Sequence, residues 1–284
     1  MNADGPAPLP NDAIGDDARQ PSGPQAPAAN LGLTADFVMA LRFFSRLPSG
    51  DSPHQKPDLN RIAMALPLAS VVIGIGPALL LIGTAMMGLP AYFAAALAVG
   101  AAVMVNGAMA EDALADSADG LFGGHTVERR LEIMKDSRHG TYGVAALCLF
   151  IVLRVVGIGS VAAVNPLAAG AIWLAAGITA RTGALWLASA LPPARSDGAA
   201  AAAGQLSKRS FAVGVVFALI LLFLLAGPPT SLFALAVALI LVVAVTAGWV
   251  ALCRRLVGGQ TGDLIGALMA VLEIAVLTAL LLFV

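Results

Sequence analysis

Long apolar runs dominate the chain from residue 62 to its end, and they restrict the fold more than any other feature. A helix needs about 20 apolar residues to cross the hydrocarbon core of a bilayer. Helices are favoured there because a membrane-spanning backbone must satisfy its own hydrogen bonds. The runs of this length, or close to it, occupy residues 62 to 87, 90 to 110, 141 to 162, 166 to 190, 211 to 227, 229 to 252 and 264 to 284. The sequence therefore predicts an all-α, polytopic transmembrane helix bundle of about seven spans.

Composition supports the same interpretation. The chain is 59% hydrophobic and 12% charged, whereas soluble domains carry roughly 25% charged residues. Its net charge of -1 gives no electrostatic basis for binding nucleic acid. We therefore expect a lipid bilayer, and no nucleic acid, among its partners. The two cysteines, Cys148 and Cys253, lack metal-ligand spacing, and we expect both to be small core residues.

Two segments precede the first apolar run. Residues 1 to 30 are rich in Pro, Ala, Gly and Asp, which predicts a disordered tail that lacks the pattern of a signal peptide. The integral membrane domain is expected to span residues 31 to 284. Between residues 31 and 47, Phe37, Leu41 and Phe44 recur at helical spacing, which predicts an amphipathic helix at the membrane interface.

Basic residues fall in alternate connections between the apolar runs. The first group is Arg42, Arg46, Lys56 and Arg61; the second is Arg129, Arg130, Lys135 and Arg138; the third is Arg195, Lys208 and Arg209; the fourth is Arg254 and Arg255. The three connections between these groups carry no charge. Because loops rich in Lys and Arg stay in the cytoplasm, we expect a cytoplasmic N-terminus.

Four acids lie within nine residues of the segment EDALADSADGLFGG, which starts at Glu111. Asp112, Asp116 and Asp119 are spaced i, i+4 and i+7, so on a helix they share one face. No Lys or Arg lies between these acids and Arg129, so we expect a divalent cation, rather than local ion pairing, to relieve the repulsion. Carboxylate oxygens suit Mg²⁺ or Mn²⁺, and Mg²⁺ commonly shares its shell with substrate phosphates. The alternative is a solvated acidic loop without a ligand.

Glycines and basic residues follow the acids. Gly120, Gly123 and Gly124 come first, and Arg129, Arg130, Lys135 and Arg138 come next. This order indicates a phosphate site, in which a metal and basic side chains flank a pyrophosphate and glycines allow close backbone approach. The alternative is that the basic residues are topology signals or lipid-headgroup contacts.

Further polar residues lie near or inside later spans. Asp263 precedes the last span on the same side as the other acids and is a candidate metal ligand, with helix capping as the alternative. Arg154, Arg181 and Glu273 lie inside predicted spans, where charged side chains usually face the bundle interior and pair. The sequence does not say which of them pair. His139, like His125, lacks metal-ligand spacing and is expected to be a polar loop residue.

The segments DALADSADGLFGG, RRLEIMKDSRHGTYGV and GGQTGDLIGA resemble the cobalamin synthase family, the adenosylcobinamide-GDP ribazoletransferases of bacteria and archaea. RFFSRLP at 42 to 48 and LPPARSDG around Arg195 extend the resemblance from about residue 34 to the C-terminus. The family usually has His and Gly where this chain has Ala110 and Ala113. The carboxylates of the motif are all retained.

The resemblance implies an inner-membrane enzyme with its active site on the cytoplasmic face. It would join α-ribazole, or its 5'-phosphate, to adenosylcobinamide-GDP with loss of GMP, using Mg²⁺, in the last assembly step of cobalamin. A homo-oligomer is compatible with this. The implied catalytic residues are Asp112, Asp116, Asp119 and Asp136, with Asp119 or Asp136 as general base; the phosphate-binding residues are Arg46, Arg129, Arg130, Lys135 and Arg138; the metal ligands are Asp112, Asp116, Asp119 and Asp263.

Two alternative functions match the sequence less well than this one. A CDP-alcohol phosphotransferase would share the metal dependence but expects an Ala-Arg pair after its first Asp-Gly, which Leu121 to Gly124 and the following IMKDSR segment do not match. A transporter would be expected to show an internal repeat and broken helices in both halves. Clustering of charges at one face suits catalysis at the membrane surface better than a transport pathway.

Overall fold

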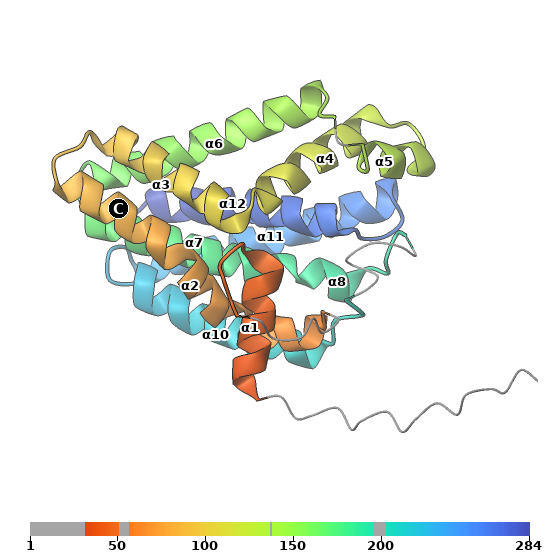
Figure 1. Cartoon of the computed structure of the whole chain (residues 1–284), viewed down its shortest axis with the longest axis horizontal. Coiled ribbons are helices and arrows are strands. Elements are labelled where there is room, and N and C mark those ends of the chain that lie inside the picture. Colours follow the sequence, from red (N-terminus) through yellow and green to blue (C-terminus); the bar gives the residue numbers. More distant parts are fainter. Residues whose placement is uncertain (1–31, 51–56, 137, 196–202) are drawn as a thin grey trace, which may run out of the picture. The chain divides into compact units, whose positions relative to one another are not determined.

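The computed structural model describes residues 32–50, 57–136, 138–195 and 203–284, and every regular element in these ranges is a helix (Figure 1). The predicted all-α class is confirmed. The predicted tail at residues 1 to 30 and Lys56 lie outside the described residues. The helices are α1 Leu33–Phe44, α2 Leu59–Met86, α3 Ala91–Asn106, α4 Met109–Gly123, α5 Val127–Ile133, α6 Thr141–Ala162, α7 Pro166–Ala184, α8 Trp186–Ala190, α10 Lys208–Ala226, α11 Leu232–Leu256 and α12 Gly262–Leu281.

Six helices in the described part of the chain are long and apolar enough to cross a membrane, and the bent pair α3 and α4 makes a seventh if it is counted as one span. The prediction of about seven spans is confirmed in this sense. Little of α10 and α11 is buried, whereas α7 and α12 are largely buried. Cys253 is buried as expected, but Cys148 on α6 is exposed. The prediction for Cys148 was wrong because lipid solvates an apolar surface at no hydrophobic cost.

The bundle is organised around α7, which packs against α2, α6, α10 and α12, while α12 also packs against α4 and α11. Small residues allow helices in lipid to approach closely. Gly214 of α10 shows this, because a β-carbon there would collide with the carbonyl oxygen of Ala63 in α2. The amphipathic helix α1 packs on α2 through Ala40, Leu41 and Phe44.

The chain bends by 86° between α3 and α4. Gly107 and Ala108 form the bend, and both have left-handed backbone conformations, with φ of 63° and 55°. Arg46 lies over this bend, with its Nε 2.6 Å from where a β-carbon of Gly107 would sit. The bend sets the acids apart from the apolar helix α3. With four carboxylates in its 15 residues, α4 is the polar part of the bent pair.

Close packing at Gly214 can be tested by substitution. Gly214→Ala is expected to lower the free energy of unfolding by about 1 to 3 kcal/mol, because the new methyl group has to displace the backbone of α2. The measurement is thermal unfolding of the purified protein in detergent. Gly248→Ala on α11, where a β-carbon meets no atom within 4 Å, is the control. Equal melting temperatures for the two variants would contradict the packing argument.

Candidate active site

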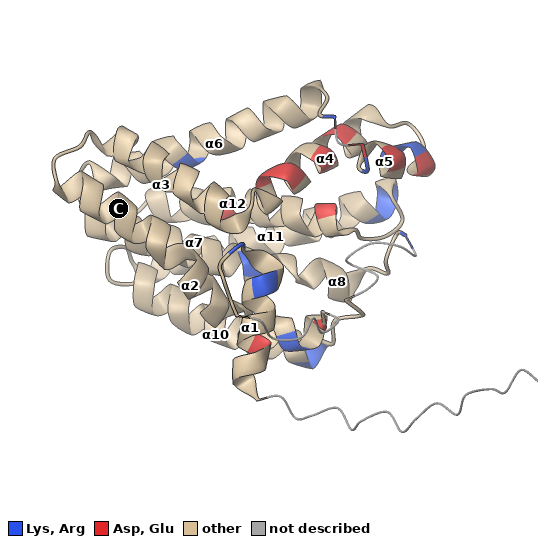
Figure 2. Cartoon of the chain, viewed as in Figure 1, with Lys and Arg blue, Asp and Glu red and all other residues tan. Residues whose placement is uncertain are grey.

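Charged residues gather at one end of the bundle. Figure 2 shows acidic residues along α4 and basic residues on α5 and at the end of α11, near the start of α12. Asp116 interacts electrostatically with Asp112, Asp119 and Asp263. We call these four residues the acidic cluster. The one-face arrangement predicted for the α4 members is confirmed by their positions on a single helix.

Asp119 is buried and fixed by the backbone of the next long helix. Its carboxylate accepts hydrogen bonds from the N–H groups of Gly140, at 2.6 Å, and Gly143, at 2.9 Å. A β-carbon on Gly140 would sit 2.6 Å from the carboxylate, and one on Gly143 would collide with it. A negative charge is favourable at the start of a helix. The two glycines of the GTYG segment therefore make room for Asp119, which joins α4 to α6.

Asp112 and Asp116 are held less tightly. His139 lies beside both, with its Nε2 3.9 Å from Asp112 Oδ1 and its Nδ1 3.6 Å from Asp116 Oδ1. These distances are too long for good hydrogen bonds. Burial, and then the charges of Asp112 and Asp263, raise the pKa of Asp116 to about 6, and His139 opposes this shift. His139 has no metal-ligand spacing in the sequence, so its place beside the acidic cluster was not predicted.

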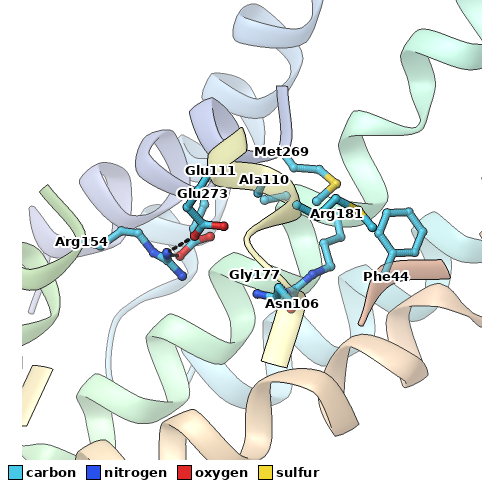
Figure 3. Close-up of a pocket in the computed structure, with 11 residues that line it drawn as sticks. Phe44, Asn106, Ala110, Glu111, Arg154, Gly177, Arg181, Met269 and Glu273 are labelled. Atoms are coloured by element: carbon cyan, nitrogen blue, oxygen red, sulfur yellow. Dashed lines mark hydrogen bonds and ion pairs between the residues drawn. The ribbon is translucent and has the colours of Figure 1, made fainter. Parts of the chain in front are cut away.

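Glu111 turns away from the acidic cluster. Its Oε1 accepts a hydrogen bond of 2.8 Å from Arg154 of α6, whose Nε donates to Glu273 of α12 at 3.0 Å (Figure 3). Trp173 of α7 also donates to Glu273, at 2.9 Å. The expectation that the charged residues inside spans face the interior and pair is confirmed for Arg154 and Glu273. The partner of Glu111 is not local, because α6 brings Arg154 from 43 residues further along the chain.

Arg181, the third charged residue inside a predicted span, has a different partner. It donates to Asn106 Oδ1 at 3.3 Å. Its side chain points toward Asn106 and Gly177, at a distance from the Arg154 pair (Figure 3).

Arg130 and the glycines after the acids connect helices. Arg130 donates to the carbonyl oxygens of Leu121, at 3.3 Å, and Leu256, at 3.0 Å. A β-carbon on Gly124 would sit 2.6 Å from Arg130 Cγ, and one on Gly120 would sit 2.9 Å from the Arg130 carbonyl oxygen. The close backbone approach predicted at these glycines therefore serves the packing of α5 on α4. The guanidinium of Arg130 bonds the ends of α4 and α11.

The other basic candidates are exposed. Arg129 pairs with Glu132 at 2.7 Å, and Arg138 pairs with Asp136 at 2.7 Å. The hydrogen bonds from Arg138 lower the pKa of Asp136 to about 2. Exposed ion pairs contribute little to stability, so a phosphate can replace these carboxylates at small cost. The remaining candidates of this kind, Lys135 and Arg46, are also exposed.

The described residues contain no group of three or more His, Cys, Asp or Glu side chains that could hold a metal ion. Asp119 is bonded to the start of α6, and Asp263 accepts a 2.8 Å hydrogen bond from Arg195. Asp112 and Asp116 are the members of the acidic cluster without such a bond. Mg²⁺ is commonly held by one or two carboxylates together with waters and substrate phosphates. The donor set therefore fits Mg²⁺ shared with a phosphate ligand.

The fold and this site define a multi-pass helical membrane protein with a carboxylate-rich helix at one end of its bundle. The family model described as cobalamin-5-phosphate synthase matches residues 36–281. The chain belongs to the cobalamin-5-phosphate synthase family, which confirms the resemblance seen in its motifs. No solved structure matches the chain.

Curated relatives that match most of the chain bear the name adenosylcobinamide-GDP ribazoletransferase. The relative from Azorhizobium caulinodans is 42% identical over 259 residues, which cover 88% of this chain and 97% of the relative. The relative from Xanthobacter autotrophicus is 41% identical over 257 residues, with the same coverage of both chains. The relative from Bradyrhizobium diazoefficiens is 40% identical over 246 residues, covering 86% of this chain and 92% of the relative.

The different surroundings of two α4 carboxylates lead to a stability prediction. Asp119→Ala is expected to lower the free energy of unfolding by about 2 to 3 kcal/mol, because it removes two charge-assisted hydrogen bonds at the start of α6. Asp112→Ala, at an exposed side chain, is expected to change it by less than about 0.5 kcal/mol. Denaturant unfolding in micelles measures both, and equal losses would contradict the distinction.

Proposed function

We propose that this protein joins α-ribazole, or its 5'-phosphate, to adenosylcobinamide-GDP and releases GMP, which is the last assembly step of cobalamin. The observation that carries the proposal is membership of the cobalamin-5-phosphate synthase family over residues 36–281. The relatives named adenosylcobinamide-GDP ribazoletransferase are matched over more than nine-tenths of their length. The charged end of the bundle supports it, because the pyrophosphate of adenosylcobinamide-GDP is an anionic group that basic side chains and a carboxylate-bound metal ion can bind.

The proposed Mg²⁺ site uses Asp112 and Asp116 together with the pyrophosphate of adenosylcobinamide-GDP. When bound there, Mg²⁺ offsets negative charge on the phosphoryl oxygens. Asp119 and Asp263 are proposed as further ligands, each through carboxylate lone pairs that its present hydrogen bonds leave unused.

The proposed phosphate contacts come from Arg129, Lys135 and Arg138, with Arg46 at the bend before α4. Arg129 and Arg138 exchange Glu132 and Asp136 for phosphate oxygens, a change of partners that keeps their charge paired. The guanidinium of Arg130 is already bonded to two carbonyl oxygens, so its proposed contribution is its charge.

In the proposed reaction, a ribose hydroxyl of α-ribazole attacks the cobinamide-linked phosphorus and GMP leaves. Asp119 and Asp136 are the candidates to take the hydroxyl proton. A pKa of about 2 makes Asp136 a weak base, and both oxygens of Asp119 already accept backbone N–H groups. Phosphoryl transfer through a loose transition state depends chiefly on positioning and charge, so a weak base is sufficient.

The proposed location is the bacterial inner membrane, with the charged end of the bundle in the cytoplasm. The basic residues of α5 and of the end of α11 share that end with the acidic cluster. Basic connections stay in the cytoplasm, and adenosylcobinamide-GDP and α-ribazole are expected to reach the site from there.

The reaction can be tested directly in liposomes that contain the purified protein. With adenosylcobinamide-GDP, α-ribazole and Mg²⁺, we expect equal amounts of GMP and of cobalamin product, and neither when the metal is chelated. The same preparation is given CDP-diacylglycerol and an alcohol acceptor. Release of CMP there, without corrinoid product in the first assay, would replace the proposal by a CDP-alcohol phosphotransferase.

Asp116→Asn tests the role of the acidic cluster. The substitution keeps the size of the side chain but removes its charge, so turnover is expected to fall at least 1,000-fold (about 4 kcal/mol of lost transition-state stabilisation) while membrane insertion is unchanged. Glu128→Gln, at an exposed residue in the first turn of α5, removes one charge nearby and is expected to keep normal activity. Normal turnover by Asp116→Asn would contradict the proposed role of Asp116 in binding Mg²⁺.

A further inference from the structure

Glu111 and Asp112 are neighbours on α4, but one is buried and the other is exposed. Glu111 is 4% exposed, whereas the side chain of Asp112 is 65% exposed. Successive residues of a helix point about 100° apart, so the direction of one fixes the direction of the other. The rotation of α4 about its axis therefore decides whether Asp112 and Asp116 face outward or into the bundle.

Arg154 is the residue that holds Glu111 inside. Its Nη1 bonds Glu111 and its Nε bonds Glu273, so one guanidinium bridges α4 and α12 from its own position on α6. The guanidinium also lies over the rings of Phe150 and Trp173, 4.9 and 5.7 Å from their centroids. Figure 3 shows the glutamates and Arg154 pointing toward one another. Glu111 Oε2 has no hydrogen-bond partner in the described structure, so its polar attachment is the bond to Arg154.

The other contacts of α4 resist rotation less. Ala113 packs against Gly266 of α12, where a β-carbon on the glycine would come 2.5 Å from the alanine methyl. Such small apolar surfaces allow close approach but have no directional bond. Asp119 is bonded to α6 eight residues after Glu111. Asp112 and Asp116 thus lie between two polar attachment points.

We propose that Glu111 and Arg154 are positioning residues: their buried ion pair fixes the rotation of α4, so that Asp112 and Asp116 face the substrate. Glu273, on the other arm of Arg154, has no such effect on α4. The inference about substrate rests on the proposed function, whereas the inference about α4 rotation does not.

A labelling experiment tests the rotation without any activity. Ser117 of α4 is fully buried, and Ser117→Cys in a Cys148→Ala background provides a thiol reporter on α4. With a water-soluble maleimide, Glu111→Gln is expected to raise the labelling rate of this thiol at least tenfold. Glu273→Gln removes a buried carboxylate from the same guanidinium but leaves α4 attached, so it is expected to change the rate by less than about twofold. Similar rates in the two variants would overturn the proposal.

Arg154→Lys is a second variant for the labelling experiment if the Glu111→Gln protein does not insert into the membrane. Lysine keeps the charge but lacks the planar group that reaches two carboxylates, so the labelling rate is expected to rise several-fold. An unchanged rate would overturn the proposal equally.

Activity adds a second readout. The Mg²⁺ concentration for half-maximal turnover is expected to rise about tenfold in Glu111→Gln and to stay within about twofold of wild type in Glu273→Gln. A parallel rise in both variants would mean that the ion pair has only a structural role. If the wild-type protein shows no transferase activity, the proposed function fails, and the labelling rates still decide whether Glu111 positions α4.

Discussion

The arrangement of this protein depends on the ion pairs of one buried arginine, Arg154, which is shielded from water. Arg154 bonds Glu111 and Glu273 inside a bundle whose outer surface is apolar, and a single charge left unpaired there would be costly. Three helices therefore meet at one guanidinium. The bond from Glu111 to Arg154 and the bonds from Asp119 to α6 attach α4 to the bundle, together with its packing on α12 and the hydrogen bonds of Arg130.

Residues of one chemical type take different roles here because their surroundings differ. Glu111 neutralises a buried arginine, Asp119 bonds the start of α6, and Asp263 accepts from Arg195. Asp112 and Asp116 remain beside His139. A count of carboxylates along the segment therefore overstates the number without a protein partner, and the proposed metal site is centred on Asp112 and Asp116, whose carboxylates have no direct hydrogen bond in the described structure.

The sequence predicted what depends on length, polarity and local spacing. Apolar runs marked the spans, and the i, i+4, i+7 spacing placed Asp112, Asp116 and Asp119 on one helix. The sequence could not predict which residues pair when the partners are distant in the chain: Arg154 lies 43 residues from Glu111 and 119 from Glu273. The bend was also missed, because Ala108 gives no local signal of its left-handed backbone. The glycines around residue 140 were visible as a motif, but their function depends on the Asp119 carboxylate that they accommodate.

The attachment of α4 has a consequence for how the protein is made. A chain is synthesised from its N-terminus, so α4 is complete before Arg154 of α6, the buried partner of Glu111, exists. Arg154 in turn meets its second carboxylate only when α12 is made, because Glu273 lies 119 residues further along the chain. The buried charges are therefore paired in two steps during synthesis, α6 supplying the cation for α4 and α12 completing its surroundings.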